Sequence, residues 1–222
     1  MSKVLVTGSD SGLGKLLKNK LLWDHQVIDY DRNLGSDVRT PDLGDLEELD
    51  ILINCAAINK IDWLENFPEQ DWDDVMDTNA KGIYMMSKAC LPMLVKSKGT
   101  ILNIVSNASH MPMTCSLAYT ASKGAAHIMT LQLARELTKK HGITGFGIAP
   151  NKLSGTGMSD DIDEQVGKTR GWTKEYAQEY QLNGLLTGEE TPPELLAEFI
   201  TFLLQDKEHH KYLSGCVIPY GA

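Results

Sequence analysis

Short apolar runs, rich in β-branched residues, recur along the chain and predict the strands of a sheet. The run Ile51–Asn54 is unbroken in its apolar character, which is typical of a strand buried on both faces. The strands predicted in this way are Val4–Thr7, Gln26–Asp31, Ile51–Asn54, Thr100–Ser106, Thr144–Ala149 and Cys216–Pro219.

Between these runs, apolar residues recur three and four positions apart, which is the spacing of a helix that packs along one face. Leu13, Leu16, Leu17 and Leu21 show this spacing directly after the first strand. Further helices are predicted over Thr78–Lys96, Tyr119–Lys140 and Pro192–Leu204.

Strands that alternate with helices predict an α/β fold with a doubly wound, Rossmann-like parallel sheet in three αβα layers. No repeat or Pro/Ser-rich linker divides the chain, so we expect residues 1–222 to form one domain. The least regular stretch, residues 151–191, carries Trp172, Tyr176 and Tyr180. We expect this insertion to cover a ligand at the carboxyl ends of the strands. The alternative is a surface helical hairpin whose aromatic side chains pack on the core.

The composition is that of a soluble globular protein, with 42% hydrophobic and 23% charged residues. The 21 Lys and Arg against 30 Asp and Glu give a net charge of -9, and no dense basic cluster favours a nucleic-acid partner. The longest strongly apolar stretch, Ile51–Ile58, is far shorter than the ~20 residues of a membrane helix. Glycines interrupt the N-terminus before a signal segment forms. We therefore expect a cytoplasmic protein with neither a nucleic-acid nor a membrane partner.

Cysteine and histidine spacing gives no sign of a metal site. His209 and His210 lack companion ligands at metal spacing, so we expect a solvated pair near a helix end. The cysteines contain no C-x-x-C pair, which favours buried, reduced thiols. They are Cys55, Cys90, Cys115 and Cys216.

The first motif with chemical meaning is Thr7-Gly8-Ser9-Asp10-Ser11-Gly12-Leu13-Gly14. It follows a predicted strand and opens a helix, which is the setting of a dinucleotide phosphate loop. Its glycines allow the backbone to turn sharply and to approach a pyrophosphate at the helix N-terminus. Gly-rich turns also simply join strands to helices, but this setting favours nucleotide binding.

Asp31 closes the second predicted strand, where a carboxylate can accept hydrogen bonds from ribose hydroxyls and repel a 2′-phosphate. Arg32 beside it could instead attract that phosphate. We favour Asp31 and hence NAD(H), with NADP(H) as the second reading. An ordinary exposed ion pair is the structural alternative.

The second motif is Ser106 together with Tyr119-Thr120-Ala121-Ser122-Lys123. Tyr119 and Lys123 lie four apart on a predicted helix and therefore share a face. A phenol with a pKa near 10 needs a shift worth roughly 4 kcal/mol to act near pH 7. An ammonium ~5 Å away supplies roughly 3 kcal/mol of it. Alone, this pair is a weak signal, because most such pairs are surface contacts.

Together the motifs resemble the short-chain dehydrogenase/reductase family, in its compact single-domain branch, over nearly the whole chain. The family's Y-x-x-x-K pair is matched by Tyr119 and Lys123, and its serine by Ser106. The other matching elements are the T-G-x-x-x-G-x-G loop at Thr7–Gly14, an imperfect N-N-A-G at Asn54-Cys55-Ala56-Ala57, and the active-site asparagine at Asn79.

The resemblance implies a catalytic set in which Tyr119 is the general acid/base and Ser106 stabilises the reacting oxygen. Lys123 would lower the pKa of Tyr119 and hold the nicotinamide ribose, and Asn79 would anchor a water in a proton relay. Asp37-Val38 resembles the family's adenine-binding pair. The candidate cofactor-binding residues are Asp31 and Arg32 together with those that the resemblance implies. The latter are Gly8, Ser11, Gly12, Leu13, Gly14, Asp37, Val38, Asn54, Ala56, Tyr119, Lys123, Pro150 and Leu153.

The chain departs from the family pattern at several positions. Pro150-Asn151 stands where the family usually has P-G. In the family pattern P-G-x-x-x-T-x-M, the threonine and methionine come one residue earlier than Thr156 and Met158 do here. Too few residues separate Asp31 from Asp37 for a helix and another strand, so we expect a shortened second crossover. The remaining departures are Cys55, Ala57 and the C-terminal Pro219–Ala222.

The leading hypothesis is an oxidoreductase that transfers a hydride between NAD(P)(H) and a small-molecule carbonyl/secondary-alcohol pair. The alternatives are a non-enzymatic nucleotide-binding sensor or scaffold, and an isomerase or dehydratase that retains its nicotinamide. A homodimer or homotetramer is also expected, because the predicted catalytic helix begins with small residues that permit close approach of another backbone. The other reading is tight packing on the protein's own sheet. These residues are Ala121, Gly124, Ala125 and Ala126.

Overall fold

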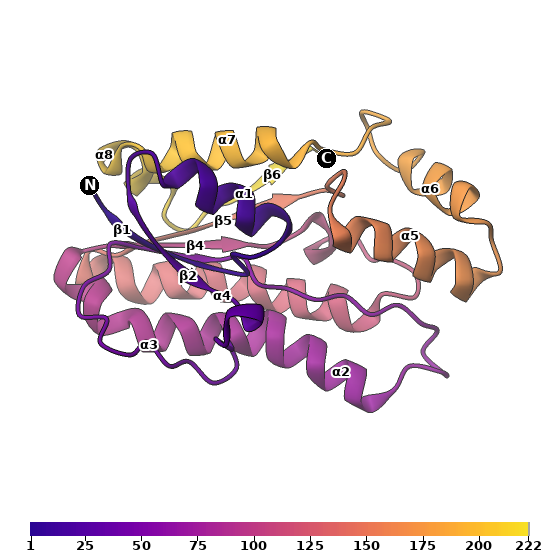
Figure 1. Cartoon of the computed structure of the whole chain (residues 1–222), viewed down its shortest axis with the longest axis horizontal. Helices are drawn as coiled ribbons and strands as arrows, with labels where there is room; N and C mark the ends of the chain where they lie inside the picture. The colour runs from indigo at the N-terminus through magenta and orange to yellow at the C-terminus, as the bar shows by residue number, and fades with distance from the viewer. Residues whose placement is uncertain (222) are drawn as a thin grey trace.

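Six strands pair in the order β2-β1-β3-β4-β5-β6, and every pair is parallel (Figure 1). The computed structural model describes residues 1–221, so Ala222 of the unusual C-terminal sequence lies outside the described residues. The predicted α/β class with a doubly wound parallel sheet is confirmed. The strands are β1 (Lys3–Thr7), β2 (Gln26–Tyr30), β3 (Ile51–Asn54), β4 (Thr100–Ile104), β5 (Thr144–Pro150) and β6 (Val217–Tyr220).

Helices cover both faces of the sheet and complete the three layers (Figure 1). Helices α1 (Gly12–Leu21) and α7 (Pro193–Leu204) pack against each other on one face. Helices α3 (Gly82–Ser97) and α4 (Leu117–His141) cover the other face. The short helix α8 (Lys207–His210) follows α7.

Successive side chains of the strands enter opposite cores, because residues of a strand alternate between its two faces. Val4 and Val6 join the core under α1 and α7, whereas Leu5 between them joins the core under α3 and α4. Phe146 is fully buried in the first core and Met86 of α3 in the second. Both faces of the central strands are therefore apolar, as the unbroken run in β3 indicates.

A helical stretch runs from Glu69 to Ser97 and is longer than the predicted helix Thr78–Lys96. It consists of α2 (Glu69–Met76), a π-helical turn (Asp77–Lys81) and α3. Val75 is the one buried residue of α2, and the apolar positions of this helix, Trp72, Val75 and Met76, are too few over eight residues to predict a helix. The π turn matters for the site because it contains Asn79.

The second crossover is shortened, as predicted. Between β2 and β3 the described chain forms one 3-10 turn, Arg32–Leu34, and otherwise irregular structure. As a result, β2 is an outer strand of the sheet.

Residues 151–191, which we call the cover segment, contain the helices α5 (Gly157–Arg170) and α6 (Lys174–Leu182). The two helices pack against each other beyond the carboxyl ends of the strands (Figure 1). Their sequences are polar, with few buried residues, which explains why the pattern of apolar positions did not reveal them.

The order of the strands places a crevice at the carboxyl ends of β1 and β3. From β1 the chain moves outward to β2, then returns past β1 to form β3 on its other side. Ligands of open α/β sheets bind at such a reversal of strand order. Within residues 1–221, no helix combines the length and the apolar character that crossing a membrane requires.

The expectation of a solvated histidine pair is wrong for His210, which is buried. The His209 side chain is 87% exposed, but His210 is buried beside the ring of Phe146. Its Nε2 lies 2.9 Å from the Thr100 hydroxyl and its Nδ1 lies 3.1 Å from the Leu203 carbonyl oxygen. The four cysteines are free: Cys90 and Cys115 are buried as expected, whereas Cys55 is partly exposed and Cys216 is exposed.

We predict that His210 makes the fold less stable in mild acid. Burial lowers the pKa of His210 below its ordinary value of 6.5, so the unfolded chain takes up a proton more readily than the folded one. The free energy of unfolding should therefore fall as the pH drops through and below 6.5. Denaturant titrations at pH 7.5 and 5.5 should show a smaller loss for His210→Gln than for the wild type. The matched variant His209→Gln should keep the wild-type loss, and equal losses in all three proteins would contradict the prediction.

Candidate active site

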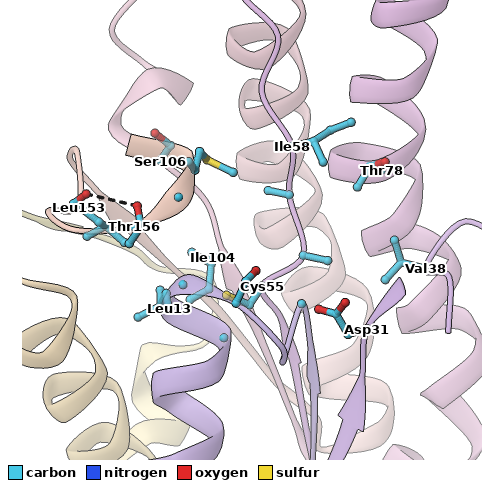
Figure 2. Close-up of a pocket in the computed structure, with 18 of the residues that line it drawn as sticks. Leu13, Asp31, Val38, Cys55, Ile58, Thr78, Ile104, Ser106, Leu153 and Thr156 are labelled. Atoms are coloured by element: carbon cyan, nitrogen blue, oxygen red, sulfur yellow. Dashed lines mark hydrogen bonds between the residues drawn. The ribbon is translucent and has the colours of Figure 1, made fainter. Parts of the chain in front are cut away.

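A cavity of about 340 Å³ lies at the carboxyl edge of the sheet, where the sequence places its chemical motifs (Figure 2). Asp31 and Val38 lie at one end, and Ser106, Leu153 and Thr156 at the other (Figure 2). The sequence-predicted residues that line it are Gly8, Ser11, Gly12, Leu13, Gly14, Asp31, Arg32, Asp37, Val38, Ala56, Ser106, Tyr119, Lys123, Pro150 and Leu153. Asn54 and Asn79 do not line it.

The glycine loop, Thr7–Gly14, leaves β1 and presents the N-terminus of α1 to this cavity. Ser11 is the N-cap residue of α1, but its side chain makes no capping hydrogen bond. The first backbone N–H groups of α1 are therefore available to an anion. A side chain at Gly14 would overlap the carbonyl oxygen of Gly8, so the tight packing of helix on loop requires glycine there.

The Thr7 side chain holds the glycine loop against the chain that leaves β3. Its buried hydroxyl accepts the backbone N–H groups of Cys55 and Ala56 at 2.9 and 3.0 Å. Ser9 has a similar role toward β2, since its hydroxyl accepts the N–H of Tyr30 at 3.1 Å. Neither role was predicted from the sequence. The one signal for the role of Thr7 is that a residue with a hydroxyl group directly precedes Gly8, the first glycine of the loop.

Asp31 follows β2 and faces the cavity (Figure 2). Its carboxylate accepts the N–H of Asp10 from the glycine loop at 3.1 Å and the N–H of Asn33 at 2.8 Å. Arg32 lies on the same rim and is exposed. The structure thus brings both candidate determinants of cofactor choice to one end of the cavity.

Asp37 is paired with a neighbour that sequence reasoning did not single out. The Arg39 guanidinium donates to both carboxylate oxygens of Asp37, at distances of 2.7 to 3.1 Å, and lies 3.5 Å from Asp74. The side-chain hydrogen bonds from Arg39 hold the pKa of Asp37 below its usual value. Val38, between them, is buried and forms the apolar wall of this end.

Ser106, Tyr119 and Lys123 come together at the opposite end of the cavity. Ser106 follows β4, and its hydroxyl accepts the N–H of Ala108 at 3.2 Å. Tyr119 and Lys123 lie one turn apart on α4, with the Lys123 Nζ 5.7 Å from the centre of the phenol ring. The same Nζ donates to the Ile104 carbonyl at 2.9 Å, and its residue is only 3% exposed.

The surroundings of these groups shift their pKa values in opposite directions. Burial raises the pKa of Tyr119, although a hydrogen bond with Ser106 opposes the shift. Burial lowers the pKa of Lys123 to about 8. Burial also raises the pKa of Cys55 to about 12, so this thiol stays neutral beside the ammonium. The free protein therefore presents a neutral phenol and a serine hydroxyl, which can both donate hydrogen bonds to a carbonyl oxygen.

Asn79 does not line the cavity but supports residues that do. It is fully buried in the π turn, its Oδ1 accepts the N–H of Ile58 at 2.8 Å, and its Nδ2 donates to the carbonyl of the same residue at 2.8 Å. The Nδ2 also donates to the Ser122 hydroxyl at 3.0 Å. Asn79 thereby connects the loop after β3, which lines the cavity, to the helix that carries Tyr119 and Lys123.

Asn54 lies inside the protein instead of facing the cavity. Its Nδ2 donates to Asn103 Oδ1 at 2.8 Å, and Asn103 in turn donates to the Thr130 hydroxyl at 2.9 Å. The two asparagines are register partners on β3 and β4. This buried polar chain holds the central strands against α4.

The residues after β5 reach the cavity despite their altered spacing. Thr156, Met158 and Leu153 all line it. Thr156 is the N-cap of α5: its hydroxyl accepts the N–H of Ser159 at 3.2 Å and donates to the Leu153 carbonyl at 3.4 Å (Figure 2). The late threonine therefore occupies the helix start that faces the glycine loop.

The aromatic residues of the cover segment do not line the cavity, contrary to expectation. The Trp172 ring lies 5.0 Å from the rings of both Tyr176 and Tyr180. The Arg170 guanidinium lies over Trp172 and Tyr180, at 4.7 and 5.2 Å from the ring centres. These side chains pack on one another, and α5 supplies the cavity wall through Met158 and Ile162.

The sequence profile of short chain dehydrogenases matches residues 43–167, more than half of the chain. The chain belongs to the short-chain dehydrogenase family. A solved short chain dehydrogenase family protein of Francisella tularensis superposes with a TM-score of 0.82 at 23% identity, over 99% of this chain and 96% of that one. This likeness confirms the Rossmann-like fold.

Curated relatives of this short-chain dehydrogenase include a 3-oxoacyl-(acyl-carrier-protein) reductase of Staphylococcus epidermidis, 31% identical over 174 residues. The matched region is 77% of this chain but only 64% of the relative. A 5-keto-D-gluconate 5-reductase of Escherichia coli is 36% identical over 107 residues, which are 48% of this chain and 42% of the relative. The match to these relatives thus leaves a third or more of their length uncovered.

We predict that Asn79→Leu lowers the stability of this short-chain dehydrogenase by about 3 kcal/mol, because it leaves the half-buried N–H and carbonyl of Ile58, and the buried Ser122 hydroxyl, without this partner. Denaturant unfolding followed by fluorescence measures the loss. The matched variant Asn19→Leu replaces an exposed helical asparagine and should change stability by less than about 0.5 kcal/mol. A loss of stability below about 1 kcal/mol for Asn79→Leu would show that the hydrogen bonds of Asn79 do not hold the loop after β3 in place.

Proposed function

We propose that the protein is an oxidoreductase that transfers a hydride between a nicotinamide dinucleotide and a ketone or secondary alcohol. One observation carries the proposal. Ser106, Tyr119 and Lys123 line the same cavity as an uncapped helix N-terminus and a glycine loop. An anion site and a proton donor at opposite ends of one cavity suit a dinucleotide whose reactive ring lies beside a carbonyl compound.

The residues present fit such a cofactor. The free N–H groups of α1 suit the pyrophosphate, and the rim formed by Asp31 and Arg32 suits the adenosine ribose. Lys123 and the backbone near Leu153 are proposed to hold the nicotinamide end. When bound, the nicotinamide supplies or accepts the hydride.

The protein's own groups would manage the proton. In the direction of reduction, the neutral Tyr119 phenol donates its proton to the carbonyl oxygen, while the Ser106 hydroxyl holds that oxygen by a hydrogen bond. The phenolate that remains is stabilised by the Lys123 ammonium and regains a proton from solvent. Because Lys123 has a pKa of about 8, it carries its charge at neutral pH. In the direction of oxidation the same groups act in reverse order.

The substrate is proposed to be a small molecule with a ketone. The names of the two relatives describe the reduction of a 3-oxo group and of a 5-keto group. Met158 and Ile162 give the reacting end an apolar wall, which suits the carbon skeleton beside a ketone. We also propose that the cover segment encloses this substrate.

NAD(H) is the proposed cofactor, with NADP(H) as the alternative. Arg39 is occupied by Asp37 and Asp74, which leaves Arg32 as the cation opposite Asp31 at the ribose end. A carboxylate at this position accepts ribose hydroxyls and repels a 2′-phosphate.

The expectations of a homo-oligomer and of a cytoplasmic location stay predictions. On α4, Ala126 is fully buried within the chain, which accords with packing on the protein's own sheet. Ala121, Gly124 and Ala125 are partly exposed, and Ile128 farther along is 64% exposed. A second subunit would find its contacts there.

We predict that Tyr119→Phe lowers the rate of ketone reduction by about 10³-fold, because it removes the proton donor. The dissociation constant of the nicotinamide cofactor should stay within about threefold. NAD(P)H oxidation against a panel of ketones, together with cofactor titration, measures both values. The matched variant Tyr84→Phe alters an exposed tyrosine and should keep full activity.

Three outcomes would oppose this assignment. Activity above a tenth of the wild-type rate in Tyr119→Phe would rule out the phenol as the essential acid. Tight cofactor binding by a wild type that turns over no ketone or alcohol would favour the sensor or scaffold. Turnover of a substrate without net NAD(P)H change would favour an isomerase or dehydratase.

We predict that Asp31→Ser raises the preference for NADPH over NADH at least about tenfold in kcat/KM, because the negative charge that repels the 2′-phosphate is gone. The opposite change, Arg32→Ser, should leave the use of NADH intact. Steady-state kinetics of the wild type and both variants, with NADH and with NADPH, measures this preference. A wild type that favours NADPH and loses this preference in Arg32→Ser would establish the NADP(H) reading.

A further inference from the structure

The two ends of the cover segment are joined at one point of the sheet edge. Three hydrogen bonds of Thr191 join them there. Its hydroxyl donates to Asn151 Oδ1 at 2.5 Å, its N–H donates to the Lys152 carbonyl at 2.9 Å, and its carbonyl accepts the Ser154 N–H at 3.0 Å. The two backbone bonds form a parallel β-bridge between Thr191 and Leu153. Residues 155–189 therefore leave and return at the same place. The unusual Asn151 supplies one of the contacts that close this loop.

The C-terminal residues pack against this closure. The Asn151 N–H donates to the Tyr220 carbonyl at 3.0 Å. A side chain at Gly221 would overlap the Thr191 hydroxyl, so glycine allows the last strand to approach the joined ends. The ends of the cover segment are thus fixed to the sheet, and its two helices are the part that needs a separate anchor.

A buried ion cluster supplies that anchor. The Lys152 ammonium forms ion pairs with Asp163 of α5 and with Glu190, the latter at 2.8 Å. Gln181 of α6 donates to the same Asp163 carboxylate at 2.7 Å. The side chains of the three charged residues are 10%, 4% and 11% exposed. The Lys152 ammonium thus connects the chain after β5 to α5 and to the segment that precedes α7, and Asp163 extends the cluster to α6.

The cluster acts directly behind the cavity wall. Asp163 is adjacent in sequence to Ile162, and Lys152 and Ile162 both line the cavity. The apolar contacts of the cover helices form one small core, in which Val166 and Ala177 are buried with Ile61 and Cys115, and Ile162 and Trp172 pack against them.

Hydrogen bonds from Ile61 N–H to Gln165 Oε1 and from Trp63 Nε1 to the Thr169 carbonyl, both at 3.1 Å, also hold α5. Two buried carboxylates beside these contacts would oppose them unless a cation offset their charges.

We propose that Lys152 is a positioning residue: its ammonium offsets the charges of two buried carboxylates, which lets α5 and α6 stay over the cavity and so sets the affinity for the carbonyl substrate. The proposal rests on the proposed function for its substrate, but the anchoring itself does not. The cluster has one cation and two carboxylates, so its members are not equivalent. Without Lys152, two buried carboxylates face each other and require water, whereas without the Asp163 charge the Lys152–Glu190 pair remains.

Hydrogen–deuterium exchange of the cofactor-free protein tests the anchoring. In K152M, amides of α5 and α6 should exchange at least tenfold faster than in the wild type, while those of α1 and α7 stay unchanged. The variant K152M/D163N/E190Q removes the unpaired carboxylates and should return to within threefold of the wild type. K168M, which replaces an exposed lysine of the same helix, should exchange as the wild type does.

Three results would overturn the anchoring. They are unchanged exchange in K152M, exchange in the triple variant as fast as in K152M, and equal acceleration in K168M. A role of Lys152 in filling space alone predicts the second result, because the triple variant restores no volume. If K152M does not fold, the triple variant carries the test: it should fold and exchange within threefold of the wild type, and a triple variant that fails to fold or exchanges at least tenfold faster would overturn the proposal.

Kinetics tests the consequence for the substrate. In K152M, KM for the ketone should rise at least tenfold, while the dissociation constant of the cofactor stays within threefold and KM recovers in the triple variant. An unchanged KM, or an equal loss of cofactor affinity, would overturn the positioning role. A wild type without ketone turnover would instead refute the proposed function and leave the exchange results to decide the anchoring.

Discussion

The backbone that leaves a parallel sheet must find partners for its N–H and carbonyl groups, and the cavity depends on how this requirement is met. Three buried side chains meet it: Thr7 for the chain after β3, Ser9 for β2, and Asn79 for Ile58. Each joins segments that are distant in sequence. Because the loops are held in this way, the glycine loop, the Asp31 rim and the start of α4 with Tyr119 and Lys123 face one another across a defined space.

The sheet and its main helices could be predicted because their residues are buried on fixed faces. The strands carry unbroken apolar runs, and α3 repeats Ile83, Met86 and Cys90 on its buried side. The helices α2, α5 and α6 could not, because they bury few residues and owe their helical form to tertiary contacts and caps such as Thr156. His210 was misread for a related reason: its partners come from β4 and α7, which no local pattern reveals.

Much of the candidate site could be predicted because its residues all follow the carboxyl ends of strands, or lie on the helix that begins there. Asn54 is the exception, since its side chain points along the sheet to its register partner Asn103. Lys152 belongs to no spaced motif, and only the fold shows that its carboxylate partners come from two other segments. A motif specifies which residues meet the ligand, whereas the residues that hold them in place follow from packing.

The shortened second crossover leaves β2 without an outer neighbour, and an uncovered strand edge is a template for pairing with another chain. The strand carries its own protection. Asp29 within it forms an ion pair with Lys18 of α1 at 2.7 Å, and a charged side chain on an outer strand discourages a foreign strand from adding to the sheet. Between β2 and β3 the described chain adds no strand to this edge, so the charged pair on β2 takes the place of a covering element in discouraging edge-to-edge pairing.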